Sequence, residues 1–238
     1  DSNTDNSLYI SPSEAADSIS DNDLLIIVDT HNKDFIESPL LYERSRQTVI
    51  IDHHRKTVNF IDDAVIFHHE PYASSASEMV TELIQYFKID DEALKACFEE
   101  ALLAGITLDT KNFVMRTGVR TFEAAAFLRK MGADTVVVKS LFSNSIETYQ
   151  RKTKIVSSAQ IHNRCAIAST EIKSDDIRLI CPQAADELLG ITNVDASFVL
   201  FRTGDTINIS ARSLGALNVQ VIMEALGGGG HQTMAAAQ

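Results

Sequence analysis

Short apolar runs alternate with longer amphipathic stretches through residues 1–144. Two of these runs, 24–28 and 48–51, are bounded by polar residues and have the length of buried strands. Later stretches show helical periodicity, and they predict helices at 75–88, 91–107, 120–131 and 133–142. Buried strands in alternation with such helices indicate an α/β domain with a parallel sheet.

The pattern changes after residue 144. The segment 145–160 has helical propensity but only a narrow apolar stripe, which is typical of a connecting helix. Beyond it the sequence predicts a strand at 165–168, a short helix at 183–189, a hairpin of 197–202 with 207–211, and a helix at 218–226. We therefore expect an α/β domain at 1–144, incomplete at its N-terminus, a linker helix at 145–160 and a smaller α+β domain at 161–238.

Composition narrows the classes of function. The 238 residues carry a formal net charge of -12, which argues against duplex nucleic acid because such binding needs a basic face. Bound metal ions would make the local charge positive, so the chain could still bind a small anionic ligand. Three widely spaced cysteines, without a CxxC pair, fit a reducing cytosol. The polar start without Met, together with the apolar last residues, leads us to expect an internal fragment of a longer protein.

Acidic and histidine residues stand where the predicted strands end. The first strand runs into Asp-Thr-His at 29–31 and the second into Asp-His-His at 52–54. Because parallel strands present their carboxyl ends at one edge of a sheet, we expect Asp29 and His53 to meet there, with Asp109 joining from the end of a helix. Two carboxylates and an imidazole suit Mn²⁺ or Fe²⁺ better than structural zinc. Singly, each residue could be a helix cap or a surface histidine.

Candidate phosphate-binding residues lie in the second domain. Four glycines at 227–230, followed by His231, exceed what a helix end requires, and they would let backbone N–H groups approach a phosphate. A flexible hinge is the alternative. Arg212, at the end of the predicted hairpin, is a candidate phosphate clamp, and a solvated arginine is the simpler interpretation. The serine-rich stretch before the helix at 75–88 either caps that helix or binds an anion.

The order of these motifs resembles that of the DHH/DHHA1 phosphoesterase superfamily. The motifs are Val-Asp-Thr-His at 28–31, Asp-His-His at 52–54, Leu-Asp-Thr at 108–110, Ser-Ala-Arg-Ser at 210–213 and the glycine run with His231. Within the superfamily, the stretches 109–113, 116–118 and 120–125 look like the GdpP-type cyclic di-AMP phosphodiesterases. This resemblance implies a bacterial parent protein that is anchored in the membrane, with its catalytic part at the cytoplasmic face. The fragment alone would then be soluble in the cytoplasm.

The resemblance also implies a reaction, the two-metal hydrolysis of cyclic di-AMP to linear pApA with Mn²⁺. Asp29 would bridge the two ions, and His53 and Asp109 would complete the coordination of the second ion. His54 would contact the scissile phosphate. Asp52 would orient an imidazole. Further contacts to the dinucleotide would come from Arg212, Gly228, Gly229, Gly230 and His231.

One motif of the family is missing. Its earlier strand-end motif, a His followed by Asp-x-Asp, has no match before residue 24, and residues 1–23 contain no histidine. We therefore expect at most one bound ion in this chain, and weak or absent activity.

Other functions stay open at this point. The chain could be a nanoRNase or 3′-phosphoadenosine phosphatase of the same superfamily, or a non-catalytic nucleotide-binding fragment with a regulatory role. A family II pyrophosphatase is less favoured, because the glycine run with His231 marks another kind of second domain. The sequence leaves homodimer formation open.

Overall fold

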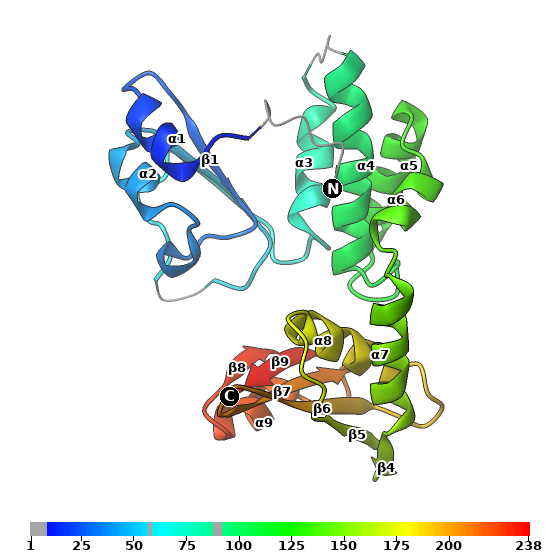
Figure 1. The fold of residues 1–238 in the computed structure, drawn as a ribbon. Helices are drawn as coiled ribbons and strands as arrows, with labels where there is room; N and C mark the ends of the chain where they lie inside the picture. The colour runs from blue at the N-terminus through cyan, green and yellow to red at the C-terminus, as the bar shows by residue number, and fades with distance from the viewer. Residues whose placement is uncertain (1–8, 57–58, 88–91) are drawn as a thin grey trace. The chain divides into compact units, whose positions relative to one another are not determined.

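The chain divides into two compact units, Asp1–Ser143 and Asn144–Gln238 (Figure 1). The computed structural model describes residues 9–56, 59–87 and 92–238, without the side chains of 92–97. In this described part, no helix combines the length and the hydropathy that crossing a membrane would require. The division of the chain at 1–144, 145–160 and 161–238 stays a prediction.

A parallel sheet organises the first unit. Its strands are β1 (Leu25–Val28), β2 (Thr48–Asp52) and β3 (Ile66–His69), in the order β1-β2-β3. The register aligns Val28 with Ile51 and Asp52 with His69, so all three strands present their carboxyl ends at one edge. The predicted parallel sheet is confirmed. The third strand was not predicted, because the two histidines in Ile-Phe-His-His interrupt the apolar run.

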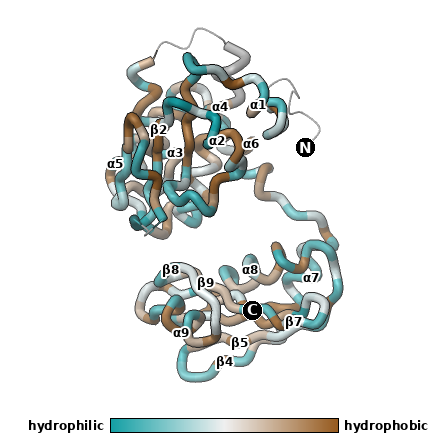
Figure 2. Tube along the Cα trace, turned by 90° about the vertical axis from the view of Figure 1, so that its left-hand side faces the viewer, coloured by the Kyte–Doolittle hydropathy of each residue, from teal (hydrophilic) through white to brown (hydrophobic). Residues whose placement is uncertain are grey.

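Helices surround and extend this sheet. Their bounds are α1 (Pro12–Ser18), α2 (Pro39–Arg44), α3 (Ala76–Ile84), α4 (Glu92–Asp109), α5 (Val119–Met131) and α6 (Thr135–Leu141), with a 3₁₀ turn η2 at Lys33–Phe35. Met79 of α3 packs on Ile51 of β2, and α4, α5 and α6 form an apolar cluster around Ile106 and Leu128. Apolar residues run along β2 and α3 (Figure 2). Helix α3 therefore covers β2, the central strand of the sheet.

Strand β1 is less buried than its sequence indicates. Of its four residues only Ile27 is buried, whereas Ile26 and Val28 are half exposed. The reason is its position at the edge of the sheet, where the described residues cover one face. By contrast, β2 lies between two strands and is buried along most of its length.

The second unit contains a six-stranded sheet between helices. Its elements are α7 (Ile146–Ser157), β4 (Gln160–His162), β5 (Cys165–Thr170), α8 (Ile177–Leu188), β6 (Ala196–Thr203), β7 (Thr206–Ser213), α9 (Val219–Ala225), β8 (Gly229–His231) and β9 (Met234–Ala237). The strand order is β4-β5-β6-β7-β9-β8, with only β5 and β6 parallel. The predicted α+β character is confirmed.

Two apolar clusters lie on opposite faces of this sheet. Ile155 of α7 and Ile180 of α8 pack with Val199 of β6, whereas Met223 of α9 packs with Ala196 and other small residues. Helix α8 begins six residues before the predicted 183–189, because its first turns bury apolar side chains despite an internal proline. The last two residues of the glycine run belong to strand β8, which the sequence did not predict.

Candidate metal centre

Asp29 is the first residue of the site along the chain, and it follows directly after β1. Its backbone is left-handed, with φ of 64°, and its N–H donates to the carbonyl of Ile51 over 2.9 Å, which extends the pairing with β2. Such a backbone costs on the order of 1 kcal/mol for a non-glycine residue, and asparagine and aspartate tolerate it best. Strain of this kind concentrates at functional sites. It places the Asp29 carboxylate at the sheet edge, where it is more than half exposed.

His53 follows β2 and faces this carboxylate. Its Nδ1 lies 3.3 Å from the carbonyl oxygen of Ala73. Because a carbonyl can only accept, Nδ1 carries the proton and Nε2 is left as a ligand atom. The Nε2 atom lies 3.4 Å from Asp29 Oδ1 and 3.7 Å from Asp109 Oδ2. The structure thus brings together the three residues that the sequence selected as metal ligands.

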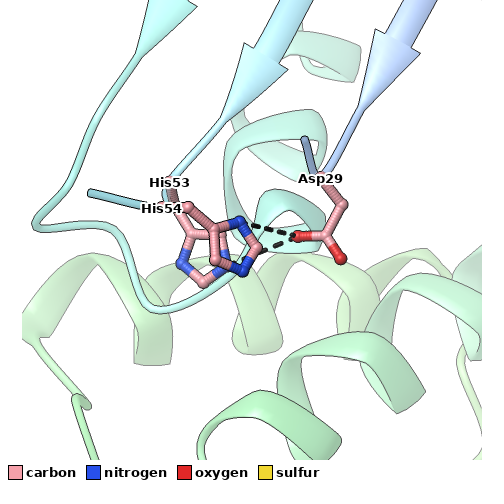
Figure 3. A group of neighbouring side chains, drawn as sticks. All are labelled: Asp29, His53 and His54. Atoms are coloured by element: carbon pink, nitrogen blue, oxygen red, sulfur yellow. Dashed lines mark ion pairs between the residues drawn. The ribbon is translucent and has the colours of Figure 1, made fainter. Parts of the chain in front are cut away.

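The spacing of these atoms fits a divalent cation. Neighbouring ligands of a six-coordinate cation at about 2.1 Å from the metal lie about 3 Å from one another. The two distances from His53 Nε2 exceed this value only slightly, and small side-chain rotations would bring the atoms to the ligand spacing. Asp29, His53 and His54 also offer ligand atoms within 4.8 Å of one another, and their side chains converge in Figure 3. The identity of the metal stays a prediction.

Asp109 reaches the site from the last turn of α4. Burial raises its pKa, and the negative charge of Asp29 adds to the shift. The chain after it is tightly folded, since Lys111, Asn112 and Phe113 are all left-handed and the hydroxyl of Thr110 accepts from the Phe113 N–H over 2.9 Å. This turn fixes the end of α4. A bound cation would relieve the repulsion between the two carboxylates.

Asp52 and His54 form a pair behind the ligands. Asp52 is fully buried, which by itself raises its pKa, but hydrogen bonds from His54 and His31 outweigh burial and hold the pKa well below its usual range. His54 Nδ1 lies 2.7 Å from Asp52 Oδ1. This hydrogen bond raises the pKa of His54. The pair leaves Nε2 of His54 as the atom that can meet a ligand.

The raised pKa of His54 predicts its titration in the metal-free chain. We expect its NMR titration to lie above the ordinary imidazole range, and Asp52→Asn to lower it, because the substitution removes the carboxylate that stabilises the proton. Since the folded pKa exceeds the unfolded value of about 6.5, this pairing stabilises the fold fully below about pH 6.5 and is lost as pH rises through the folded pKa. His54→Gln identifies the resonance. A His54 pKa at or below the ordinary value would contradict the assignment.

In the second unit, the residues predicted to bind phosphate take part in side-chain pairing, close packing and strand pairing. Arg212 is buried, with its Nε 3.1 Å from Asp186 Oδ1 and Nη1 donating to its neighbour's carbonyl. The interpretation of a solvated arginine is therefore wrong. Gly228 and Gly230 lie so close to β9 that a Cβ atom on either would overlap its backbone, whereas Gly229 faces open space. His231 pairs with Met234 in the β8–β9 ladder. Phosphate binding by these residues stays a prediction.

The serine-rich start of α3 is a helix cap. The hydroxyl of Ser75 accepts from the Glu78 N–H over 3.0 Å, and that of Ser74 donates to the buried Glu78 carboxylate over 2.6 Å. The capping interpretation is confirmed.

Two histidines near the site were not selected from the sequence as functional residues. His31 and His69 form, with Asp52, a second group whose ligand atoms lie within 4.8 Å of one another. The signal for His31 was its place two residues after Asp29. No such signal existed for His69, because β3 was not predicted.

Comparison with known proteins identifies both parts of the chain. Residues 3–106 match the N-terminal domain of the DHH family, and residues 163–238 match the DHHA1 domain. The chain is 48% identical over 234 residues to a cyclic-di-AMP phosphodiesterase GdpP of Geobacillus thermodenitrificans, and 43% identical over 231 residues to the cyclic-di-AMP phosphodiesterase PdeA of Listeria monocytogenes. These matches cover 96% of this chain but 35% of each relative.

A solved structure shares the fold. The crystal structure of an exopolyphosphatase-related protein from Bacteroides fragilis superposes with a TM-score of 0.80 at 22% identity, and the match covers 95% of this chain and 69% of that one. The order of motifs, the parallel sheet with acidic and histidine residues at its edge, and the two matched domains agree. The chain belongs to the DHH family and carries a DHHA1 domain as its second domain.

Proposed function

We propose that this chain is the phosphodiesterase part of a longer protein that hydrolyses cyclic di-AMP to pApA. The observation that carries the proposal is the convergence of Asp29, His53 and Asp109 at one sheet edge. The names of the two relatives, which are cyclic-di-AMP phosphodiesterases, support the substrate. Since the chain spans about a third of their length, the activity of the whole protein belongs to this proposal.

The chain's own residues suggest how a phosphodiester would be held. Asp29, His53 and Asp109 would hold Mn²⁺, which would supply Lewis acidity toward water and phosphoryl oxygen. His54 donates from Nδ1 to Asp52, and this hydrogen bond raises the pKa of His54 and so favours the protonated ring, whose Nε2 would also carry a proton. A protonated imidazole there donates to a non-bridging phosphate oxygen and stabilises the negative charge that grows in the transition state. His54 thus acts as a substrate contact.

The second unit would hold the rest of the dinucleotide. We propose this role for Arg212, Gly228, Gly229, Gly230 and His231. Arg212 is held by Asp186 and its neighbour's carbonyl, so the plane of its guanidinium is already set. We also propose that the parent protein lies at the cytoplasmic face of the membrane, and fractionation of cells that express it tests this.

A comparison of substrates tests the function. Purified chain with Mn²⁺ is incubated with cyclic di-AMP, with linear di- and trinucleotides and with 3′-phosphoadenosine, and the products are separated by chromatography. We expect pApA from cyclic di-AMP as the preferred reaction. Faster release of AMP from linear substrates would favour a nanoRNase, and faster release of phosphate from 3′-phosphoadenosine would favour the phosphatase.

The number of bound ions tests the expected low activity of this chain without the rest of the parent protein. Three protein ligands and water hold one ion, whereas a second ion with a single carboxylate competes poorly with bulk water. We expect at most one Mn²⁺ per chain in equilibrium dialysis, and turnover lower by orders of magnitude than in the parent protein. Two tightly bound ions with full turnover would contradict this expectation. Nucleotide binding that persists in EDTA without turnover would indicate a regulatory fragment.

A further inference from the structure

A buried carboxylate is shared between two imidazoles behind the metal centre. Asp52 is fully buried and its two oxygens have different partners. Oδ1 accepts from Nδ1 of His54 over 2.7 Å and lies 3.2 Å from the His54 backbone nitrogen, whereas Oδ2 is in close contact with Nδ1 of His31. His31 is 1% exposed. The three side chains form a continuous line from the protein interior to the half-exposed ring of His54.

The inner end of this line is held on several sides. The carbonyl of His31 accepts from the Ile61 N–H over 2.8 Å. Its ring meets Phe67 and His69 edge-on, with centroids 6.2 Å and 5.1 Å away. His69 in turn donates from Nε2 to the carbonyl of His54 over 2.5 Å. Residues from β3 thus fix both His31 and the backbone of His54.

The arrangement restricts the orientation of His54. A carboxylate bonded to one imidazole alone can turn about its Cβ–Cγ bond and carry that imidazole with it. A second donor on the other oxygen fixes the plane of the carboxylate, and so the direction in which it accepts from His54 Nδ1. Partners of this kind orient the histidines of metal sites, and substituting them typically lowers metal affinity or activity ten- to hundredfold.

We propose that His31 is a positioning residue that acts through Asp52 to fix the orientation and tautomer of His54. It lies inside the protein and does not touch the substrate. The identity of the phosphate that His54 meets rests on the proposed function, but the fixed orientation of His54 does not. A cation held by His31, Asp52 and His69 is the competing interpretation. It is less favoured because both oxygens of Asp52 already accept hydrogen bonds from imidazoles.

Two substitutions of His31 separate the hydrogen bond from the packing. Asparagine and leucine have nearly the same shape, so His31→Asn and His31→Leu leave similar space, but only asparagine keeps a donor near the position of Nδ1. With cyclic di-AMP and Mn²⁺ we expect His31→Leu to lower kcat about ten- to hundredfold with KM within about twofold. We expect His31→Asn to recover most of kcat. Where the chain turns over too slowly, the parent protein is used.

A second measurement does not depend on turnover. In histidine side-chain NMR of the metal-free chain, we expect the His54 Nδ1–H proton to be protected from solvent in the wild type and in His31→Asn, and to exchange rapidly in His31→Leu. Mn²⁺ binding should be the same in all three. If the wild-type parent protein does not hydrolyse cyclic di-AMP, the proposed function fails, while the NMR comparison still decides the role of His31.

Several results would overturn the proposal. An unchanged His54 signal in His31→Leu would show that Asp52 alone orients the ring. Equal loss of kcat in both variants would show a packing role, and loss of a bound cation in His31→Leu would assign the second cluster to a metal. Should the leucine variant not fold, the asparagine variant decides, because retained kcat and a retained His54 signal support the proposal and their loss contradicts it.

Discussion

Asp29→Asn is expected to lower Mn²⁺ affinity sharply and to reduce turnover of cyclic di-AMP in the parent protein by about a thousandfold. The substitution removes a negative charge that lies 3.4 Å from His53 Nε2 while keeping the shape of the side chain. Asparagine also tolerates the left-handed backbone at this position, so the connection from β1 should not change. Loss of several kcal/mol of charge stabilisation corresponds to this factor in rate.

A matched carboxylate outside the site serves as the control. Asp21 is exposed and paired with Arg46 on the surface, where such a pair contributes at most about 1 kcal/mol. Asp21→Asn should leave Mn²⁺ affinity and turnover unchanged. Isothermal titration of Mn²⁺ and product chromatography measure both variants. Wild-type metal affinity in Asp29→Asn would exclude Asp29 as a ligand.

The second large effect concerns the stability of the second unit. A Cβ atom on Gly228 would lie 2.1 Å from the carbonyl oxygen of Ala236 and 2.5 Å from the Cα of Ala237. Backbone atoms of a paired strand cannot move aside cheaply, so Gly228→Ala should force the glycine run away from β9. We expect a loss of about 2–3 kcal/mol in the free energy of unfolding, and faster hydrogen exchange at residues 234–237.

The neighbouring Gly229 supplies the control in the same glycine run. A Cβ atom on Gly229 meets nothing within 4 Å, and its backbone is not left-handed. Gly229→Ala should therefore change the unfolding free energy by no more than about 0.5 kcal/mol. The same variant tests phosphate binding, because a methyl group there would hinder the approach of an anion. Wild-type nucleotide affinity in Gly229→Ala would count against a phosphate contact at this position.

Much of the first unit followed from the sequence alone. The runs at 24–28 and 48–51 have the length and composition of strands, and the residues just after parallel strands must meet at one edge. For this reason the sequence by itself predicts that Asp29 and His53 lie together. The position of Asp109 followed in the same way from the end of a long amphipathic helix. Each inference depends on local periodicity, which a sequence carries directly.

Tertiary structure decided what lies around these residues. The sequence does not show that the Ala73 carbonyl sets the tautomer of His53, or that Asp52 is shared by His31 and His54. The first depends on the segment that follows β3, and the second on the pairing of β1 with β2. Local pattern could not reveal β3, because hydrogen bonding to a neighbouring strand, and not alternation of its own residues, makes it a strand.

For Arg212 and the glycines of the second unit, too, the sequence predicted the residue types and the tertiary structure decided their surroundings. Their residue types predicted contact with phosphate, and the sequence determined that such a group of donors exists in this domain. Only the fold shows that Arg212 is buried against Asp186 and that Gly228 is required by the close approach of β9. Burial and interstrand spacing arise from pairing between distant segments, so they are properties of the folded chain and not of any stretch of its sequence.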